Sequence, residues 1–250
     1  MSLTSLLVAN RGEIAVRILR AAAEAGLRTT SVYSEDDIGA LHVRMADESR
    51  PLPGMGSESY LNAALIVEEA RAIGCEAIHP GYGFLSEKPD FALLCEENNL
   101  VFVGPTADHL KLFGDKLAAR AHASACGIPV APGTNSSTSL EECQDFLKSL
   151  GGDEAIMIKA VAGGGGLGMR EVRDVDSIQS AYERCRSEAL RSFGNDEVYV
   201  EKVIHNVRIR TISRAHPWAT LPMGYPPFFE ITFVKSTKID DYCSTWRKIT

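Results

Sequence analysis

The sequence predicts an α/β protein: a Rossmann-like open parallel sheet followed by a small α+β unit. Short apolar runs alternate with segments of helical period over residues 1–130, and glycines or prolines separate them. Such alternation is typical of a parallel sheet whose strands are joined by helices. The second unit is indicated by four consecutive glycines, residues 163–166, which lie between two short apolar runs.

The composition is that of a globular protein with a sizeable core, because 45% of its 250 residues are hydrophobic and 24% are charged. The formal net charge of -7, without a Lys- or Arg-rich block, argues against a nucleic-acid partner but leaves room for a bound nucleotide. No apolar run approaches the roughly 18 residues of a membrane span, and the first residues resemble no signal or transit peptide. Six cysteines without a CxxC pair fit reduced thiols, so we expect a cytoplasmic protein without a membrane partner.

The first unit begins with strand, helix and strand. Leu6–Ala9 is an apolar run, and residues 14–22 repeat Ile, Ile and Ala at a four-residue spacing, which predicts an amphipathic helix that ends at Gly26. Thr29–Tyr33 is rich in β-branched residues and predicts the second strand. Because such crossover connections join parallel strands, the opening favours a parallel sheet.

The alternation continues to about residue 130, where glycines and prolines at 127–133 mark a boundary. We therefore assign one domain to residues 1–130 and a second to residues 131–206. No helical period remains after residue 206, and four of the eleven prolines and both tryptophans fall there, so residues 207–250 form a tail without a predicted fold. The other predicted elements are helices 63–73, 91–97, 140–150 and 175–191 and strands 76–79, 100–103, 155–159, 169–172 and 198–204.

The glycine run is the first candidate site. Glycines allow backbone N–H groups to approach an anion closely, because no Cβ intervenes. The run is neither a Walker A loop nor a GxGxxG turn that opens a helix, so it resembles a flap that covers phosphates. Lys159 ends the preceding strand and Lys116 begins a helix, so both are candidates to contact those phosphates. The alternatives are a plain flexible hairpin and solvated lysines.

Two turns of the first unit carry chemical groups. The turn ANRGEIA follows a strand and opens a helix, but its single glycine and Arg11 make it weak support for a dinucleotide. The turn HPGYGFLSE ends a strand where open α/β folds bind ligands, and it carries His79, Tyr82 and Glu87. A purely structural histidine is the alternative reading of His79. The remaining histidines show no metal-ligand spacing, so no metal site is predicted.

Several stretches together resemble a known family. LLVANRGEIAVRILRAA, IHPGYGFLSE, VGP, GDK, IKAVAGGGGLGM and VYVEKVI occur in this order. Residues 4–206 thus resemble the N-terminal half of a biotin carboxylase, in the ATP-grasp superfamily, as found in acetyl-CoA, propionyl-CoA and pyruvate carboxylases. The resemblance implies a pre-ATP-grasp domain, then the lid module of an incomplete ATP-grasp fold. It also implies an ATP- and bicarbonate-dependent ligase that carboxylates biotin on a carrier domain through carboxyphosphate, with Mg2+ required by the full-length family.

The resemblance also implies roles for particular residues. Lys116 and Lys159 are expected to contact the phosphates of ATP. An exposed strand edge at 201–204 is expected to present backbone groups to the adenine ring. The implied lid comprises Gly163, Gly164, Gly165, Gly166 and Met169; the adenine end Glu201, Lys202 and Ile204; and the surroundings of the carboxylation site Tyr82, Gly83 and Glu87.

The family pattern does not continue after Arg208. The family's magnesium-binding carboxylates and the groups that act on bicarbonate and biotin have no counterpart motif, although Glu230, Asp240 and Asp241 are carboxylates. We therefore expect an ATP-binding fragment, truncated and with a divergent tail, that is inactive alone. Two alternatives stay open: another ATP-grasp ligase, related to carbamoyl-phosphate synthetase, and a non-catalytic binding or regulatory module. The acyl-CoA or keto-acid substrate and the oligomeric state are not predicted.

Overall fold

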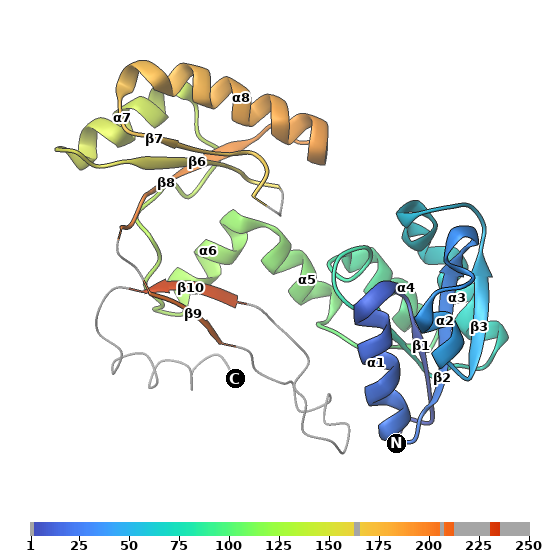
Figure 1. The fold of residues 1–250 in the computed structure, drawn as a ribbon. Coiled ribbons are helices and arrows are strands. Elements are labelled where there is room, and N and C mark those ends of the chain that lie inside the picture. Colours follow the sequence, from blue (N-terminus) through green and yellow to red (C-terminus); the bar gives the residue numbers. More distant parts are fainter. Residues whose placement is uncertain (1–2, 163–165, 206–207, 213–230, 236–250) are drawn as a thin grey trace. The chain divides into compact units, whose positions relative to one another are not determined.

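The computed structural model describes residues 3–162, 166–205, 208–212 and 231–235 (Figure 1). Most of them fall into two compact units, which divide between Lys111 and Leu112. The sequence analysis places this boundary near residue 130, whereas the division after Lys111 assigns the helix that begins at Lys116 to the second unit. Strands β9 (Arg208–Ile212) and β10 (Ile231–Lys235) pair with each other in a two-stranded sheet.

The first unit is built on a five-stranded sheet with the order β3-β2-β1-β4-β5. Every neighbouring pair in it is parallel, which confirms the predicted sheet. The order with β1 at the centre is the arrangement of doubly wound folds, whose ligands bind beyond the carboxyl ends of the strands. The strands are β1 (Ser5–Val8), β2 (Arg28–Ser34), β3 (Glu48–Leu52), β4 (Ala77–His79) and β5 (Val101–Phe102).

Helices cover both faces of this sheet. Alternate residues of β1 therefore pack into two different hydrophobic clusters, one on each face. Leu6 and Val8 pack in one cluster with α1 (Gly12–Glu24), whereas Leu7 packs in the other. Two further helices, α3 (Ala63–Ala72) and α4 (Pro89–Glu97), contribute to the cluster around Leu7. The remaining elements are η1 (Glu35–Asp37), α2 (Leu41–Met45) and η2 (Ser57–Leu61). The division between the two units falls within α5 (Ala107–Gly114).

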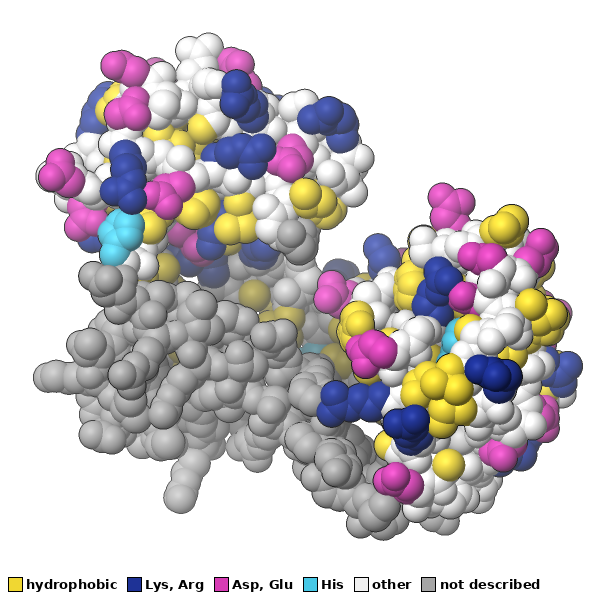
Figure 2. All heavy atoms as spheres, in the orientation of Figure 1, with side chains coloured by type: hydrophobic (Ala, Val, Ile, Leu, Met, Phe, Trp, Pro, Cys, Tyr) yellow, Lys and Arg dark blue, Asp and Glu magenta, His cyan; other side chains and the backbone are white. Residues whose placement is uncertain are grey.

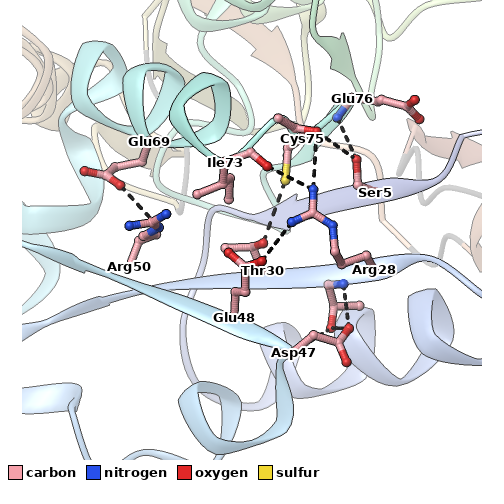
Figure 3. Close-up of polar contacts among 12 residues, drawn as sticks. Ser5, Arg28, Thr30, Asp47, Glu48, Arg50, Glu69, Ile73, Cys75 and Glu76 are labelled. Atoms are coloured by element: carbon pink, nitrogen blue, oxygen red, sulfur yellow. Dashed lines mark hydrogen bonds and ion pairs between the residues drawn. The ribbon is translucent and has the colours of Figure 1, made fainter.

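Polar contacts close the amino-terminal edge of the sheet (Figure 3). The guanidinium of Arg28 lies 2.9 Å from Glu48 Oε1 on the neighbouring strand and donates to the carbonyl of Ile73 at 2.9 Å. The hydroxyl of Ser5 accepts a hydrogen bond of 3.0 Å from the backbone N–H of Glu76. These contacts join the amino-terminal ends of β1, β2, β3 and β4 and help to fix the strand register. The carboxyl-terminal ends of the strands, where open α/β folds bind ligands, are not occupied by these contacts.

The second unit is a three-stranded antiparallel sheet with the order β7-β6-β8. One face is covered by two helices, as Figure 1 shows, and Ile156 and Ile158 are fully buried beneath them. Alternation along the strands turns Met157, Lys159 and Glu201 to the other face. The elements are α6 (Lys116–Ala125), α7 (Leu140–Leu150), β6 (Ile156–Ala160), β7 (Met169–Val172), α8 (Val175–Phe193) and β8 (Val198–Lys202).

Candidate nucleotide site

A carboxylate shared by two cations lies on the face of β6 and β8 that is turned away from α7 and α8. Lys159 Nζ is 2.5 Å from Glu201 Oε2, and Arg120 Nη1 is 2.6 Å from Glu201 Oε1. The strand register explains the first contact, since Lys159 pairs with Tyr199 and the adjacent Met157 pairs with Glu201. The second brings in Arg120, a residue of α6 that the sequence analysis did not single out.

Lys116 joins this cluster from the start of α6. Its Nζ donates a hydrogen bond of 3.1 Å to the carbonyl oxygen of Ala160, the last residue of β6. Burial lowers the pKa of Lys116, and the positive charge of Lys159 lowers it further, whereas the carboxylates of Glu201 and Asp115 act in the opposite sense. The structure therefore brings the two predicted phosphate-binding lysines together with Glu201.

The glycine hairpin leaves β6 directly beyond this cluster. Gly163, Gly164 and Gly165 lie outside the described residues, whereas Gly166 begins the described return of the chain. Gly168 has a left-handed φ of +66°, and a Cβ at this position would lie 2.9 Å from Ala160 Cβ. Met169 then starts β7 opposite Lys159. Packing within the hairpin therefore accounts for Gly168.

The outer edge of β8 is paired, contrary to the expectation of an exposed edge there. The N–H of Lys202 donates to the carbonyl of Pro132 at 2.7 Å, and Thr134 N–H donates to the carbonyl of Val200 at 2.9 Å. The strand ends at Lys202, two residues earlier than predicted, and Ile204 beyond it is 36% exposed. An adenine ring would therefore have to meet backbone groups past the end of β8.

The turn with Tyr82 is held by a buried amide that the sequence analysis did not single out. Asn10 Nδ2 donates to the carbonyl oxygens of Pro80 at 2.7 Å and of Tyr82 at 2.9 Å. Gly81 has a φ of +70°, and a Cβ there would lie 2.6 Å from Asn10 Nδ2. Tyr82 is 62% exposed and its Oη donates to Glu13 Oε1 at 3.2 Å.

The other predicted groups of this turn differ in their surroundings. Gly83 has a φ of +66° with nothing near its Cβ position, and Glu87 is exposed. His79 Nδ1 accepts a hydrogen bond of 3.0 Å from Gly81 N–H. Burial lowers the pKa of His79 to about 4, so its ring is neutral at physiological pH. A neutral ring that accepts from its own turn supports a structural role for His79.

Asp37, which follows β2, is already paired within the first unit. Rossmann folds that bind NAD use an acidic residue after the second strand to hold a ribose. Here Asp37 Oδ1 lies 2.5 Å from Arg11 Nη2, and its Oδ2 accepts from Tyr60 Oη at 2.7 Å. Burial opposes ionisation of Asp37, but the hydrogen bonds from Arg11 and Tyr60 outweigh it and lower the pKa. Asp37 is thus engaged within the unit.

The described residues show no sign of a metal site or a membrane-spanning helix, and the face drawn in Figure 2 carries no basic surface for nucleic acid. They contain no group of three or more His, Cys, Asp or Glu side chains that could hold a metal ion. None of the helices in the described ranges is both long and apolar enough to cross a membrane. On the face drawn in Figure 2, Lys and Arg side chains are interspersed with Asp and Glu, so no basic stripe runs across that face.

Comparison with known families matches both units. The family described as biotin carboxylase, N-terminal domain, matches residues 2–110. The family described as carbamoyl-phosphate synthase L chain, ATP binding domain, matches residues 115–212. Biotin carboxylase 1 of Bacillus subtilis is 47% identical over 205 residues, covering 81% of this chain and 45% of that protein. The chain belongs to the biotin carboxylase family.

Further relatives of this chain include larger enzymes. Pyruvate carboxylase of Bacillus subtilis is 50% identical over 209 residues, covering 82% of this chain but 18% of that protein. A crystal structure of a biotin carboxylase-β-γ-ATP complex from Campylobacter jejuni has a TM-score of 0.80 and 39% identity, covering 86% of this chain and 49% of the other. The chain therefore spans about half the length of its biotin carboxylase relatives.

A second solved structure is similar to the same extent. The biotin carboxylase domain of Hydrogenobacter thermophilus 2-oxoglutarate carboxylase, in complex with MgADP, ADP and bicarbonate, has a TM-score of 0.77 and 40% identity. The match covers 84% of this chain and 46% of that one. These likenesses, with the parallel sheet and the small antiparallel unit, confirm the predicted fold class.

Proposed function

We propose that the second unit binds ATP, and that the chain supplies the nucleotide-binding part of a biotin carboxylase. The observation that carries this proposal is the charge of the cluster around Glu201. Three cations, Lys116, Lys159 and Arg120, lie close to Glu201, and Asp115 is the second carboxylate that acts on Lys116. Phosphate oxygens would neutralise the excess positive charge and accept charge-assisted hydrogen bonds from the ammonium groups. The two related structures with bound nucleotide support the same ligand.

We propose roles for the other site residues as well. Gly163, Gly164, Gly165, Gly166 and Met169 form the lid over the phosphates, because the hairpin leaves β6 beside Lys159. Closure of such a lid excludes water from a labile intermediate. The adenine lies against the end of β8, where Glu201, Lys202 and the partly exposed Ile204 follow one another.

The first unit contributes to the carboxylation site in this proposal. Tyr82, Gly83 and Glu87 lie on or next to the turn that ends β4, at the carboxyl edge of the parallel sheet. Open α/β sheets bind their ligands at this edge. The family reaction joins bicarbonate to biotin on a carrier domain at the expense of ATP, through carboxyphosphate. Since the described residues hold no suitable acidic cluster, we assign no ligand to Mg2+.

Calorimetric titration of the 250-residue chain with ATP tests the binding proposal. We expect saturable binding, together with no biotin- and bicarbonate-dependent release of phosphate when this polypeptide is assayed alone. The chain aligns with about half of its biotin carboxylase relatives, so we propose that turnover needs groups that these residues do not supply. Absence of binding would contradict the nucleotide site, whereas robust biotin-dependent turnover would contradict the proposed inactivity.

A carbamoyl-phosphate synthetase-like ligase is the second candidate, because the second unit matches a domain named for that enzyme. The match of residues 2–110 to the biotin carboxylase N-terminal domain favours biotin as the acceptor. A bicarbonate-dependent ATPase assay of a full-length homologue, with and without free biotin, separates the two. Stimulation by biotin supports our assignment, and ammonia-dependent turnover that ignores biotin supports the alternative.

A further inference from the structure

Arg120 is the most firmly held member of the cluster around Glu201. Besides its contact with Glu201, its Nη2 donates to the carbonyl of Ala131 at 2.8 Å, and its guanidinium carbon lies 5.9 Å from the centre of the Tyr199 ring. Its side chain is 11% exposed, against 23% for Lys159. The planar guanidinium is thus fixed at several points, whereas the ammonium of Lys159 sits on a flexible stem.

The carboxylate of Glu201 contacts both Lys159 and Arg120 and cannot fully neutralise both charges. The position of Arg120 therefore determines how much of the Lys159 charge is left for a ligand. The side chain of Glu201 is 13% exposed, and a carboxylate so poorly hydrated needs a cation beside it. If Lys159 were the sole cation, its charge would be cancelled and an incoming phosphate would gain little. With Arg120 fixed on Oε1, the carboxylate is neutralised while the Lys159 ammonium keeps its attraction for an anion.

We infer that Arg120 is a positioning residue for nucleotide binding: it serves as the counterion of Glu201 and thereby keeps the charge of Lys159 available to phosphate. The inference rests on the proposed nucleotide function. Arg120 acts through Glu201 and need not touch the nucleotide. Its effect on affinity must therefore depend on whether residue 201 carries a charge.

A double-mutant cycle with Arg120→Met and Glu201→Gln tests this dependence on the full 250-residue chain. Titration calorimetry with MgADP measures the dissociation constant of each variant. We expect Arg120→Met to raise Kd about tenfold, because Glu201 then neutralises Lys159, and Glu201→Gln alone to lower Kd severalfold. In the E201Q background, Arg120→Met should change Kd less than about twofold.

The matched control is Arg191→Met, since Arg191 is an exposed arginine of the same unit whose Nε donates to the carbonyl of Ser187. Equal, additive losses from Arg120→Met in both backgrounds would show a direct electrostatic effect and overturn the inference. If thermal unfolding shows that the Arg120→Met variant does not fold, the Glu201→Gln variant provides the test. MgADP binding by Glu201→Gln that is equal to or weaker than that of the wild type would reject the inference. A wild-type chain that does not bind MgADP would instead reject the proposed function itself.

Discussion

The Nζ of Lys116 donates a hydrogen bond of 3.1 Å to the carbonyl oxygen of Ala160, and this contact joins the first residue of α6 to the last residue of β6. Asp115 caps the same helix and accepts the N–H groups of Leu117 and Ala118. The helix start is therefore fixed in place, and its lysine points to the strand that leads into the glycine hairpin. An anion bound there would meet this lysine with little loss of side-chain freedom.

Lys116→Met should raise the Kd for MgADP about tenfold, because one charge-assisted contact to phosphate is lost. The pH dependence should also change. The pKa of Lys116 is lowered, first by burial and then by Lys159, whereas bound phosphate favours the protonated lysine. The affinity of the wild type should accordingly fall as pH rises through this lowered pKa. Calorimetry between pH 7 and 10 checks it, and an alkaline loss of equal size and onset in both proteins would contradict this role.

Lys159→Ala should weaken nucleotide binding about tenfold or more without unfolding the chain. The side chain lies on the open face of β6, opposite the core residues Ile156 and Ile158, so its removal leaves the core intact. Lys148→Ala is the matched control, since Lys148 is an exposed lysine of α7 in the same unit. Titration and thermal unfolding of both variants separate the two effects. Unchanged ADP affinity in Lys159→Ala would remove its assigned role.

The face on which Lys159 lies could be predicted from the sequence, but its partners could not. The alternation in IMIKA places isoleucines on one side and lysine on the other. The contact with Glu201 depends on the register of β6 against β8, which no local pattern specifies. Arg120 is still harder to find, because it lies 81 positions before Glu201 on a helix without a distinctive charge pattern.

Two strand features escaped prediction for different physical reasons. The sequence of β3, ESRPL, is polar and contains Pro51, so it lacks the apolar run of a buried strand. Proline is tolerated there because β3 is an edge strand that pairs on one side with β2. No strand is predicted for residues 132–138, yet their backbone and the hydroxyl of Thr134 form hydrogen bonds with β8. Gly133 was the available signal, since a Cβ there would lie 2.6 Å from the carbonyl of Val200.

Gly168→Ala should lower the free energy of unfolding by about 2–3 kcal/mol, because it adds a left-handed alanine and an overlap with Ala160. Gly152→Ala is the matched control, since Gly152 has a similar φ of +61° but nothing within 4 Å of the added Cβ. That variant should lose only about 1 kcal/mol from backbone strain. Urea unfolding measures both. Equal losses would show that the close contact with Ala160 does not contribute.

The stability of the first unit should decrease on mild acidification, because burial lowers the pKa of His79 to about 4 from an ordinary value of 6.5. The unfolded chain then takes up a proton at a higher pH than the folded chain, so stability is lost as pH falls from 6.5 towards 4. The loss from His79 should reach about 3 kcal/mol by pH 4. His42, whose pKa is also lowered by burial, contributes to the loss in the same direction.

His79→Asn keeps an acceptor for Gly81 N–H but cannot titrate. Urea unfolding between pH 4 and 7 should therefore show a smaller decrease in the free energy of unfolding with falling pH for this variant than for the wild type. Parallel stability curves for the variant and the wild type would mean that the protonation of His79 is not coupled to folding.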